Sequence, residues 1–231
     1  MILIYFDNRY YEYAPVYIES IRINEPKEKI FIQGYNLTSH MVRKLESYEN
    51  VAAVNNEKLV HNRRKMNAME HYIINQKARQ ILEAFDRFPK EDLFIITDVD
   101  MLMINPLTEL RRDMKTYDVG VVWVSDKKVM GGFVAVTRKK RTREFLESWD
   151  RTMRTGRYYY NKDQPALSKT FNKFTEKLDF LLLTRQYLDA ASSPDSYIWS
   201  SHKVKQHGTK DEKNLEYSNK LKQMRKKKGL K

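Results

Sequence analysis

Two acidic residues, Asp98 and Asp100, stand one residue apart directly after an uncharged run of β-prone residues, and Asn105-Pro106 follows shortly afterwards. Such a run predicts a buried strand that ends in a turn. Carboxylate oxygens at the carboxyl end of a strand can share a divalent cation with the phosphates of a ligand. The pair therefore indicates a metal-dependent nucleotide enzyme, although this spacing also arises by chance in acidic surface turns.

The elements that must position this pair alternate between strands and helices. Apolar runs predict strands at residues 2–6, 30–32, 51–54, 93–97, 119–124, 132–136 and 180–183. Helical periodicity predicts one helix over residues 65–86 and another that begins near Thr137 as N-cap and passes Trp149. This alternation is typical of an α/β fold, in which helices flank a mostly parallel central sheet.

Composition predicts a single domain in the cytoplasm. The 231 residues are 41% hydrophobic and 12% aromatic, which is enough for one sizeable core. The absence of cysteine excludes disulfides, thiolate metal sites and cysteine nucleophiles, and it favours a reducing compartment. No stretch approaches the roughly 20 apolar residues of a membrane span, and residues 1–7 predict a first strand rather than a signal peptide.

The carboxyl-terminal segment is strongly basic. The net charge is +13, and residues 210–231 contain nine Lys or Arg residues against three acidic ones. We therefore expect a catalytic domain over residues 1–208 and a basic tail over residues 209–231. This tail is either a solvated, partly disordered end or a surface that approaches anionic lipid, at the periphery of a membrane, or nucleic acid.

Other segments become coherent if the ligand is a nucleotide diphosphate attached to a sugar. Asp7, Asn8 and Tyr10 follow the first predicted strand. A carboxylate can accept a hydrogen bond from a base, and an aromatic ring can stack on it, although these residues also suit an ordinary turn. Lys77 precedes the Asp98 strand and can reach the diphosphate or the sugar, with two arginines as alternatives, Arg64 and Arg79.

Two later segments can face the same ligand. Gly131 and Gly132 open a predicted strand and let a ligand come close to the backbone, although two glycines also suit a tight turn. Asp163 and Gln164 stand at a predicted helix start, where Pro165 is tolerated. An aspartate there can simply cap the helix, but capping does not explain the adjacent glutamine.

The last candidate segment contains His207 and Lys210. An imidazole can complete a metal shell begun by two carboxylates, and an ammonium group can neutralise phosphate charge. His202 is a competing candidate, and a histidine in a polar loop is often only solvated. The preceding long loop, residues 185–210, is expected to fold back over the site.

In their order along the chain these segments resemble the GT-A glycosyltransferases, most closely the retaining family that includes glycogenin and bacterial lipopolysaccharide galactosyltransferases. In that family an Asp-Asn-x-Tyr element, a basic helix, an Asp-x-Asp strand end, a Gly-rich strand start, an Asp-Gln pair and a late His-x-x-Gly-x-x-Lys motif follow one another. The same order runs here from Asp7 to Lys210. The late motif is shortened to His207-Gly208-x-Lys210, and no Asn precedes Gly131.

The resemblance implies a GT-A fold and a metal-dependent transfer of a hexose from a nucleotide-diphosphate sugar, most simply a UDP-hexose. Mn²⁺ or Mg²⁺ would be held by Asp98, Asp100 and His207, with Asp98 also touching the ribose, and would stabilise the leaving nucleotide. Asp163 and Gln164 would face the donor sugar.

The stereochemistry and the acceptor stay open in the sequence. For a retaining enzyme the leaving phosphate itself can deprotonate the acceptor, and the Asp-Gln pair favours this route. An inverting enzyme would need a carboxylate base, for which Asp163 or Asp195 are candidates. A basic surface suits an anionic glycan, a lipid-linked acceptor, a nucleic acid or an acidic polypeptide equally well.

Two other functions are compatible with parts of this pattern. A metal-dependent nucleotidyltransferase would also need paired acids, but the residues after the first predicted strand lack the glycine-rich phosphate loop that it requires. A non-catalytic nucleic-acid-binding protein would use the basic segments alone and would make the order of the acidic residues accidental.

Overall fold

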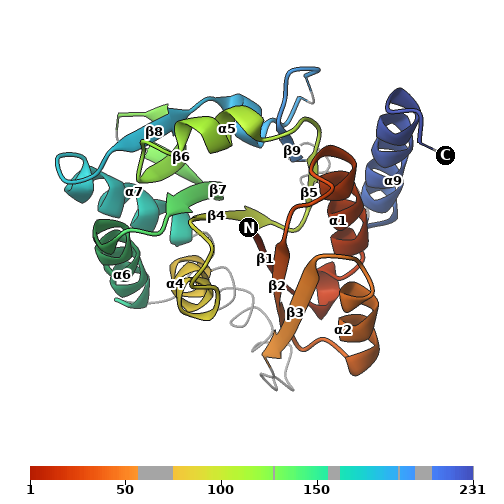
Figure 1. Ribbon diagram of the computed structural model, residues 1–231, viewed down its shortest axis with the longest axis horizontal. Helices are drawn as coiled ribbons and strands as arrows, with labels where there is room; N and C mark the ends of the chain where they lie inside the picture. Colours follow the sequence, from red (N-terminus) through yellow and green to blue (C-terminus); the bar gives the residue numbers. More distant parts are fainter. Residues whose placement is uncertain (57–74, 127, 156–161, 192, 201–209, 231) are drawn as a thin grey trace.

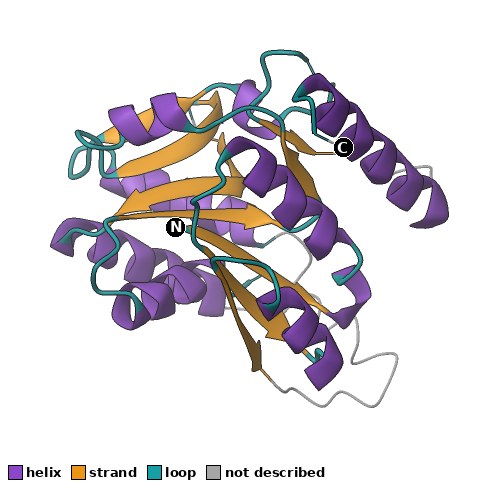
Figure 2. Ribbon diagram, turned by 45° about the vertical axis from the view of Figure 1, so that its right-hand side comes forward, coloured by secondary structure: helices purple, strands orange, loops and turns teal. Residues whose placement is uncertain are grey.

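The computed structural model has a central sheet with helices packed on both of its faces (Figure 1). Figure 2 shows the strands running through the middle of the molecule between these two helical layers. The structure describes residues 1–56, 75–126, 128–155, 162–191, 193–200 and 210–230.

The described strands form a seven-stranded sheet. In spatial order these are β3 (Val51–Asn56), β2 (Ile30–Tyr35), β1 (Ile2–Asp7), β4 (Leu93–Asp98), β7 (Lys128–Thr137), β6 (Val119–Ser125) and β8 (Phe180–Leu183). Strand β7 runs antiparallel to both of its neighbours, and every other neighbouring pair in this sheet is parallel. The predicted mostly parallel sheet is confirmed, and each predicted apolar run lies within one of its strands.

Helices connect and cover these strands. The described helices are α1 (Tyr13–Asn24), α2 (Ser39–Glu46), α4 (Lys77–Arg87), α5 (Thr108–Asp113), α6 (Lys140–Arg154), α7 (Asp163–Phe174) and α9 (Lys210–Lys227), with short 3-10 turns η1 (Asn8–Tyr10) and η2 (Arg185–Leu188). A second small sheet pairs β5 (Met101–Met103) antiparallel with β9 (Ile198–Ser200). Strand β9 and turn η2 belong to residues 185–210, the segment that was expected to fold back over the site.

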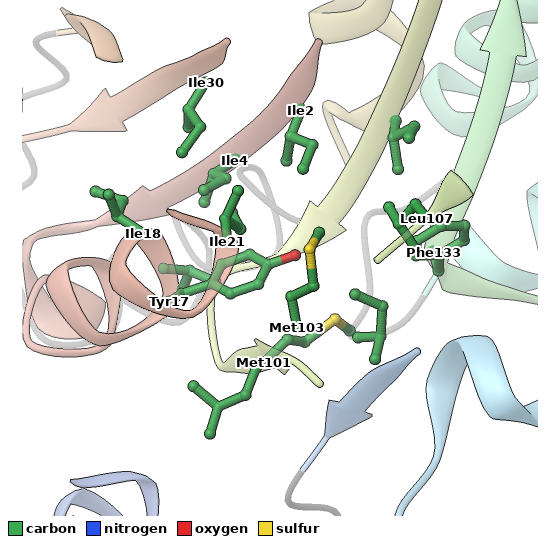
Figure 3. Packing of buried hydrophobic residues seen from close by; sticks show 14 of the residues in the cluster. Ile2, Ile4, Tyr17, Ile18, Ile21, Ile30, Met101, Met103, Leu107 and Phe133 are labelled. Carbon is green, nitrogen blue, oxygen red and sulfur yellow. The ribbon is translucent and has the colours of Figure 1, made fainter. Parts of the chain in front are cut away.

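The core has two layers because side chains alternate between the two faces of each strand. From β1, Ile2 and Ile4 pack against α1 and β5, whereas Leu3 packs on the opposite face among α4, α6 and α7. Figure 3 shows Ile2 and Ile4 beside the α1 residues Tyr17 and Ile21. Burial on both faces explains why the inner strands are apolar throughout instead of alternating with polar residues.

Helices α4 and α6 begin later in the chain than the sequence predicts. Helix α4 begins at Lys77, because Asn75 and Gln76 form a turn; most of the predicted extension, residues 65–74, lies outside the described residues. Helix α6 begins at Lys140, not near Thr137. Thr137 is the last residue of β7, where its hydroxyl donates to the Asp118 carbonyl oxygen at 3.1 Å and therefore does not cap the helix.

The basic carboxyl-terminal segment is helical over Lys210–Lys227. Helix α9 lies beside α1 (Figure 1). Tyr217 is buried, with ring centroids 5.3 Å from Tyr13 and 4.9 Å from Trp199, and its hydroxyl donates to the Asp100 carbonyl oxygen. None of the helices in the described part of the chain has the length and apolar character needed to cross a membrane.

We predict that Tyr217→Ala lowers the free energy of unfolding by about 3 kcal/mol or more, because it removes a buried aromatic ring and leaves a cavity. Leu215→Ala is the matched control. Leu215 lies on the same helix with an exposed side chain, and its truncation should change stability by no more than about 0.5 kcal/mol. Urea unfolding of both variants measures the difference, and equal effects would contradict the packing of α9.

Candidate active site

The carboxyl ends of the parallel strands place the candidate residues at one edge of the sheet. Tyr5 of β1 is the register partner of Asp98 at the end of β4, and Thr97 pairs with Phe133 of β7. Gly132 therefore lies close to Asp98, although the two are far apart in sequence. In open α/β sheets this edge is where ligands bind.

Strand β7 carries a bulge at this point. Val121 of β6 pairs with Val134, but the next residue, Val122, pairs with Met130. The three β7 residues between these partners, Gly131, Gly132 and Phe133, are therefore extra relative to β6. A bulge takes backbone groups out of the regular ladder and is common next to functional sites.

Lys77 occupies the centre of the site. It is the first residue of α4, and its side chain is buried. Its ammonium nitrogen lies 2.8 Å from Asp163 Oδ2 and 3.1 Å from Asp98 Oδ1, and it donates to the Gly131 carbonyl oxygen at 2.9 Å. A lysine ammonium group has three protons, so these three acceptors use its full donor capacity.

Tyr5 is a site residue that the sequence analysis missed. Its hydroxyl donates to Asp98 Oδ1 at 2.7 Å, and its ring centroid lies 5.5 Å from the Lys77 ammonium nitrogen. In the sequence Tyr5 is one of several large side chains in the apolar run of β1, so its pattern does not mark it as a site residue. Only the register between β1 and β4 shows that its polar end meets Asp98.

The two glycines are required by close approach of the carboxylates. A Cβ atom on Gly131 would lie 2.9 Å from Asp163 Oδ2, and one on Gly132 would lie 3.2 Å from Asp98 Oδ2. Neither carboxylate can move away without lengthening its contact with Lys77. The groups that approach the glycine backbone here are side chains of the site, and the approach of a ligand stays a prediction.

Electrostatics keeps Lys77 charged and Tyr5 neutral. Burial alone would lower the pKa of Lys77, but Asp163 and Asp98 outweigh it, and the pKa lies well above its usual value. Burial and the Asp98 carboxylate raise the pKa of Tyr5 well above its usual value. Lys77 therefore remains a cation, and Tyr5 a hydrogen-bond donor, across the physiological range.

The residues expected to hold a base lie at the same edge of the sheet. Asp7 ends β1 two residues beyond Tyr5, and its buried carboxylate accepts from the Arg9 backbone N–H at 2.9 Å and from Arg9 Nε at 2.8 Å. Asn8 is exposed, and Tyr10 is half-buried in η1. The local turn that competes with base binding is thus formed, and base binding stays a prediction.

The remaining predicted residues are described only in part. Asp100 lies on the turn between β4 and β5 with its side chain largely buried, and Gln164 is half-buried in the first turn of α7. His207, together with the alternatives His202 and Arg64, lies outside the described residues. The first residue of α9 is Lys210, whose side chain is likewise not described, whereas the alternative Arg79 is an exposed α4 residue paired with Glu83.

The described residues include two of the three predicted metal ligands. Within the described ranges, His, Asp and Glu side chains form no group of three or more that could hold a metal ion. The predicted trio Asp98, Asp100 and His207 includes a residue outside those ranges. The two carboxylates on the β4–β5 turn are the part of this trio that the structure describes.

Comparison with known proteins gives structural relatives but no family by sequence. No family model matches the chain, and no curated protein matches it. Among solved structures, the glycosyltransferase GlyE of Streptococcus pneumoniae matches with a TM-score of 0.54 and 16% identity, over 80% of this chain and 45% of that one. Its apo form gives a TM-score of 0.56 and 15% identity, over 86% and 53% of the two chains.

The galactosyltransferase LgtC, solved with donor and acceptor sugar analogues, also matches. The TM-score is 0.51 with 12% identity, over 81% of this chain and 74% of that one. At such identities the likeness shows the fold, which is the GT-A fold of these glycosyltransferases. The chain spans about half the length of the GlyE chains that it matches.

We predict that Lys77→Met destabilises the protein by about 3 kcal/mol or more at neutral pH, because it leaves the buried Asp163 carboxylate and its neighbour Asp98 without their cation. Lys90→Met is the matched control, since Lys90 is exposed in the loop after α4. Its effect should stay within about 0.5 kcal/mol. Urea unfolding compares the two, and a Lys77 variant as stable as the control would contradict the site geometry.

The raised pKa of Lys77 sets the pH dependence of this loss. A lysine whose folded pKa exceeds the unfolded value of about 10.4 contributes fully below that value and loses its contribution as pH rises through the folded pKa. The difference in unfolding free energy between wild type and Lys77→Met should therefore be constant from about pH 7 to about pH 9 and shrink only above about pH 10.4. Denaturation over a pH series tests this, and a difference that vanishes by about pH 9 would exclude it.

Proposed function

We propose that this chain is a metal-dependent glycosyltransferase that transfers a hexose from a UDP-hexose to an acceptor with retention of configuration. The observation that carries the proposal is the cluster in which Lys77 joins Asp98, from a strand end, to Asp163, from a helix start, beside the bulge at Gly131. All of these residues were selected from sequence for that chemistry. The GT-A fold supports the same class of reaction.

The donor set on the β4–β5 turn fits a divalent cation. Hard ions such as Mg²⁺ and Mn²⁺ bind through one or two carboxylates and take their other ligands from water and substrate phosphates. Asp98 and Asp100 would hold the ion, with His207 as the third protein ligand that the sequence suggests. When bound, the ion supplies Lewis-acid stabilisation of the charge on the leaving nucleoside diphosphate.

The protein's own side chains orient the donor in this proposal. Lys77 fixes two carboxylates whose remaining acceptor capacity suits the hydroxyl groups of a sugar. Asp163 and Gln164, side by side on the first turn of α7, would face that sugar. Asp7 and Tyr10 would bind the uracil base, and Lys210 the diphosphate.

Retention is supported by the surroundings of Asp163. This carboxylate is buried and paired with the Lys77 ammonium at 2.8 Å. A general base must reach the proton of the acceptor hydroxyl, and a buried carboxylate that is already held by a cation is poorly placed to do so. We infer that Asp163 positions the donor and that the leaving phosphate receives the acceptor proton.

Composition and charge support a cellular compartment and a class of acceptor. The lack of cysteine supports activity in the cytoplasm. The basic carboxyl-terminal residues, now placed on α9, support contact with an anionic acceptor or with the surface of a membrane that carries it.

A donor panel tests the proposal. Purified protein is incubated with UDP-, GDP- and ADP-sugars in Mn²⁺, Mg²⁺ or EDTA, and release of nucleotide is measured without acceptor. We expect slow hydrolysis of a UDP-hexose that is lost in EDTA and falls by about a hundredfold or more in Asp100→Asn, because a ligand of the cation is removed. Asp126→Asn, an exposed acid on the β6–β7 turn, is the control and should keep full activity.

Each other outcome contradicts a different part of the proposal. Hydrolysis that persists in EDTA would contradict the proposed metal dependence. Turnover of GDP-sugars but not of UDP-sugars would contradict the prediction that Asp7 and Tyr10 bind uracil. No turnover of any sugar nucleotide, together with salt-dependent DNA binding that survives substitution of both Asp98 and Asp100, would favour the non-catalytic nucleic-acid-binding protein.

A further inference from the structure

Trp123 has the most exposed indole among the tryptophans of this chain. Its exposed fraction is 40%, whereas Trp149 and Trp199 are almost completely buried. Large aromatic side chains give most stabilisation when they are buried. An exposed tryptophan is therefore a candidate for contact with a ligand.

The position of Trp123 relates it to the candidate active site. Strand β6 runs parallel to β4 on the other side of β7, so its carboxyl end lies at the same edge of the sheet as Asp98. Trp123 pairs with Val129, which precedes Gly131 by two residues. Two residues of strand span about 7 Å, and neighbouring strands lie about 5 Å apart. Trp123 therefore lies on the strand beside the β7 residues that lead into the bulge at Gly131.

Trp123 also faces the same side of the sheet as α7. Val121, two residues before it, packs with the helices α6 and α7, and side chains two residues apart in a strand share a face. Its partner Val129 is held against α7, because the Val129 backbone N–H donates to the Ser168 hydroxyl at 3.2 Å. Helix α7 begins with Asp163, so the same helix holds the ion-paired carboxylate and the strand next to Trp123.

A second exposed apolar side chain lies on the strand next to that of Trp123. Leu182 of the edge strand β8 is 50% exposed and pairs with Val121, which places it on the same face of the sheet. Diagonal neighbours on adjacent strands lie within reach of a long aromatic side chain. Trp123 and Leu182 thus form an apolar step, here called the Trp123 platform, on the two strands next to the candidate active site.

We propose that the Trp123 platform binds a pyranose ring of a carbohydrate acceptor, one or two residues away from the sugar that receives the hexose. The proposal rests on the proposed function. A pyranose presents C–H groups on one face and hydroxyls around its rim, so it can stack on an indole while its hydroxyls stay hydrated. The acceptor is then an oligosaccharide or a glycan already attached to a carrier, not a bare hydroxyl compound.

The burial of the other two tryptophans provides a direct test. Acrylamide quenches exposed indoles, so quenching of the wild-type fluorescence reports mainly on Trp123. The protein is titrated with lactose, maltotriose and chitotriose, each in the presence of UDP and Mn²⁺. We expect at least one oligosaccharide to protect the wild type from quenching, and no oligosaccharide to alter the residual quenching of Trp123→Phe.

Transfer assays separate this inference from the proposed function. With the protective oligosaccharide as acceptor, Trp123→Ala should raise the acceptor KM by roughly tenfold and Leu182→Ala by less, because stacking contributes more than a single aliphatic contact. Both variants should hydrolyse the UDP-hexose at the wild-type rate, since neither residue belongs to the donor site.

The two possible failures are distinguishable. Lack of protection by every oligosaccharide, or an unchanged acceptor KM in Trp123→Ala, overturns the Trp123 platform and leaves donor hydrolysis intact. Protection in a protein that turns over no sugar nucleotide would instead reject the proposed function and retain a carbohydrate-binding surface.

Discussion

The site depends on one buried ammonium group. Lys77 is held between Asp163 and Asp98 and also binds the backbone of the β7 bulge, so a single cation ties together a helix start, a strand end and an irregular strand. Removing charges from water is costly, and their mutual contacts offset that cost only if every donor and acceptor is satisfied. The ammonium meets this condition with three acceptors, and Tyr5 adds a further donor to Asp98. Side chains that are fixed in this way lose little entropy when a ligand arrives.

The topology of the sheet explains why these distant residues meet. Strand β4 ends at Asp98 in the middle of the sheet, with parallel β1 on one side and antiparallel β7 on the other. The carboxyl end of one strand therefore faces the bulge of the next. Helices α4 and α7 cover the same face and begin at this edge, which brings Lys77 and Asp163 over the strand end. The resulting fold is shared with glycosyltransferases that have little sequence identity to this chain.

Sequence patterns predicted the elements well and the contacts poorly. Continuous apolar runs located every strand of the main sheet, and for the inner strands burial on both faces explains the strength of this signal. The start of α4 was misplaced, since helical periodicity continues through residues that form a turn at Asn75 and Gln76. Asp98, Asp163 and Lys77 were identified by type and order, but their ion pairs depend on strand register and helix direction. Tyr5 was missed for the same reason, because nothing in a local apolar pattern shows which polar group its hydroxyl will meet.

The contact between Tyr217 and the Asp100 carbonyl oxygen spans 117 residues of sequence. Contacts of such long separation form late, because the intervening loop must close first. During synthesis the turn that carries both acidic residues leaves the ribosome long before its partner on α9 does. A nascent chain would therefore hold the strands of the central sheet before α9 is made, and the contact between Tyr217 and the acidic turn would form only after α9 has been synthesised.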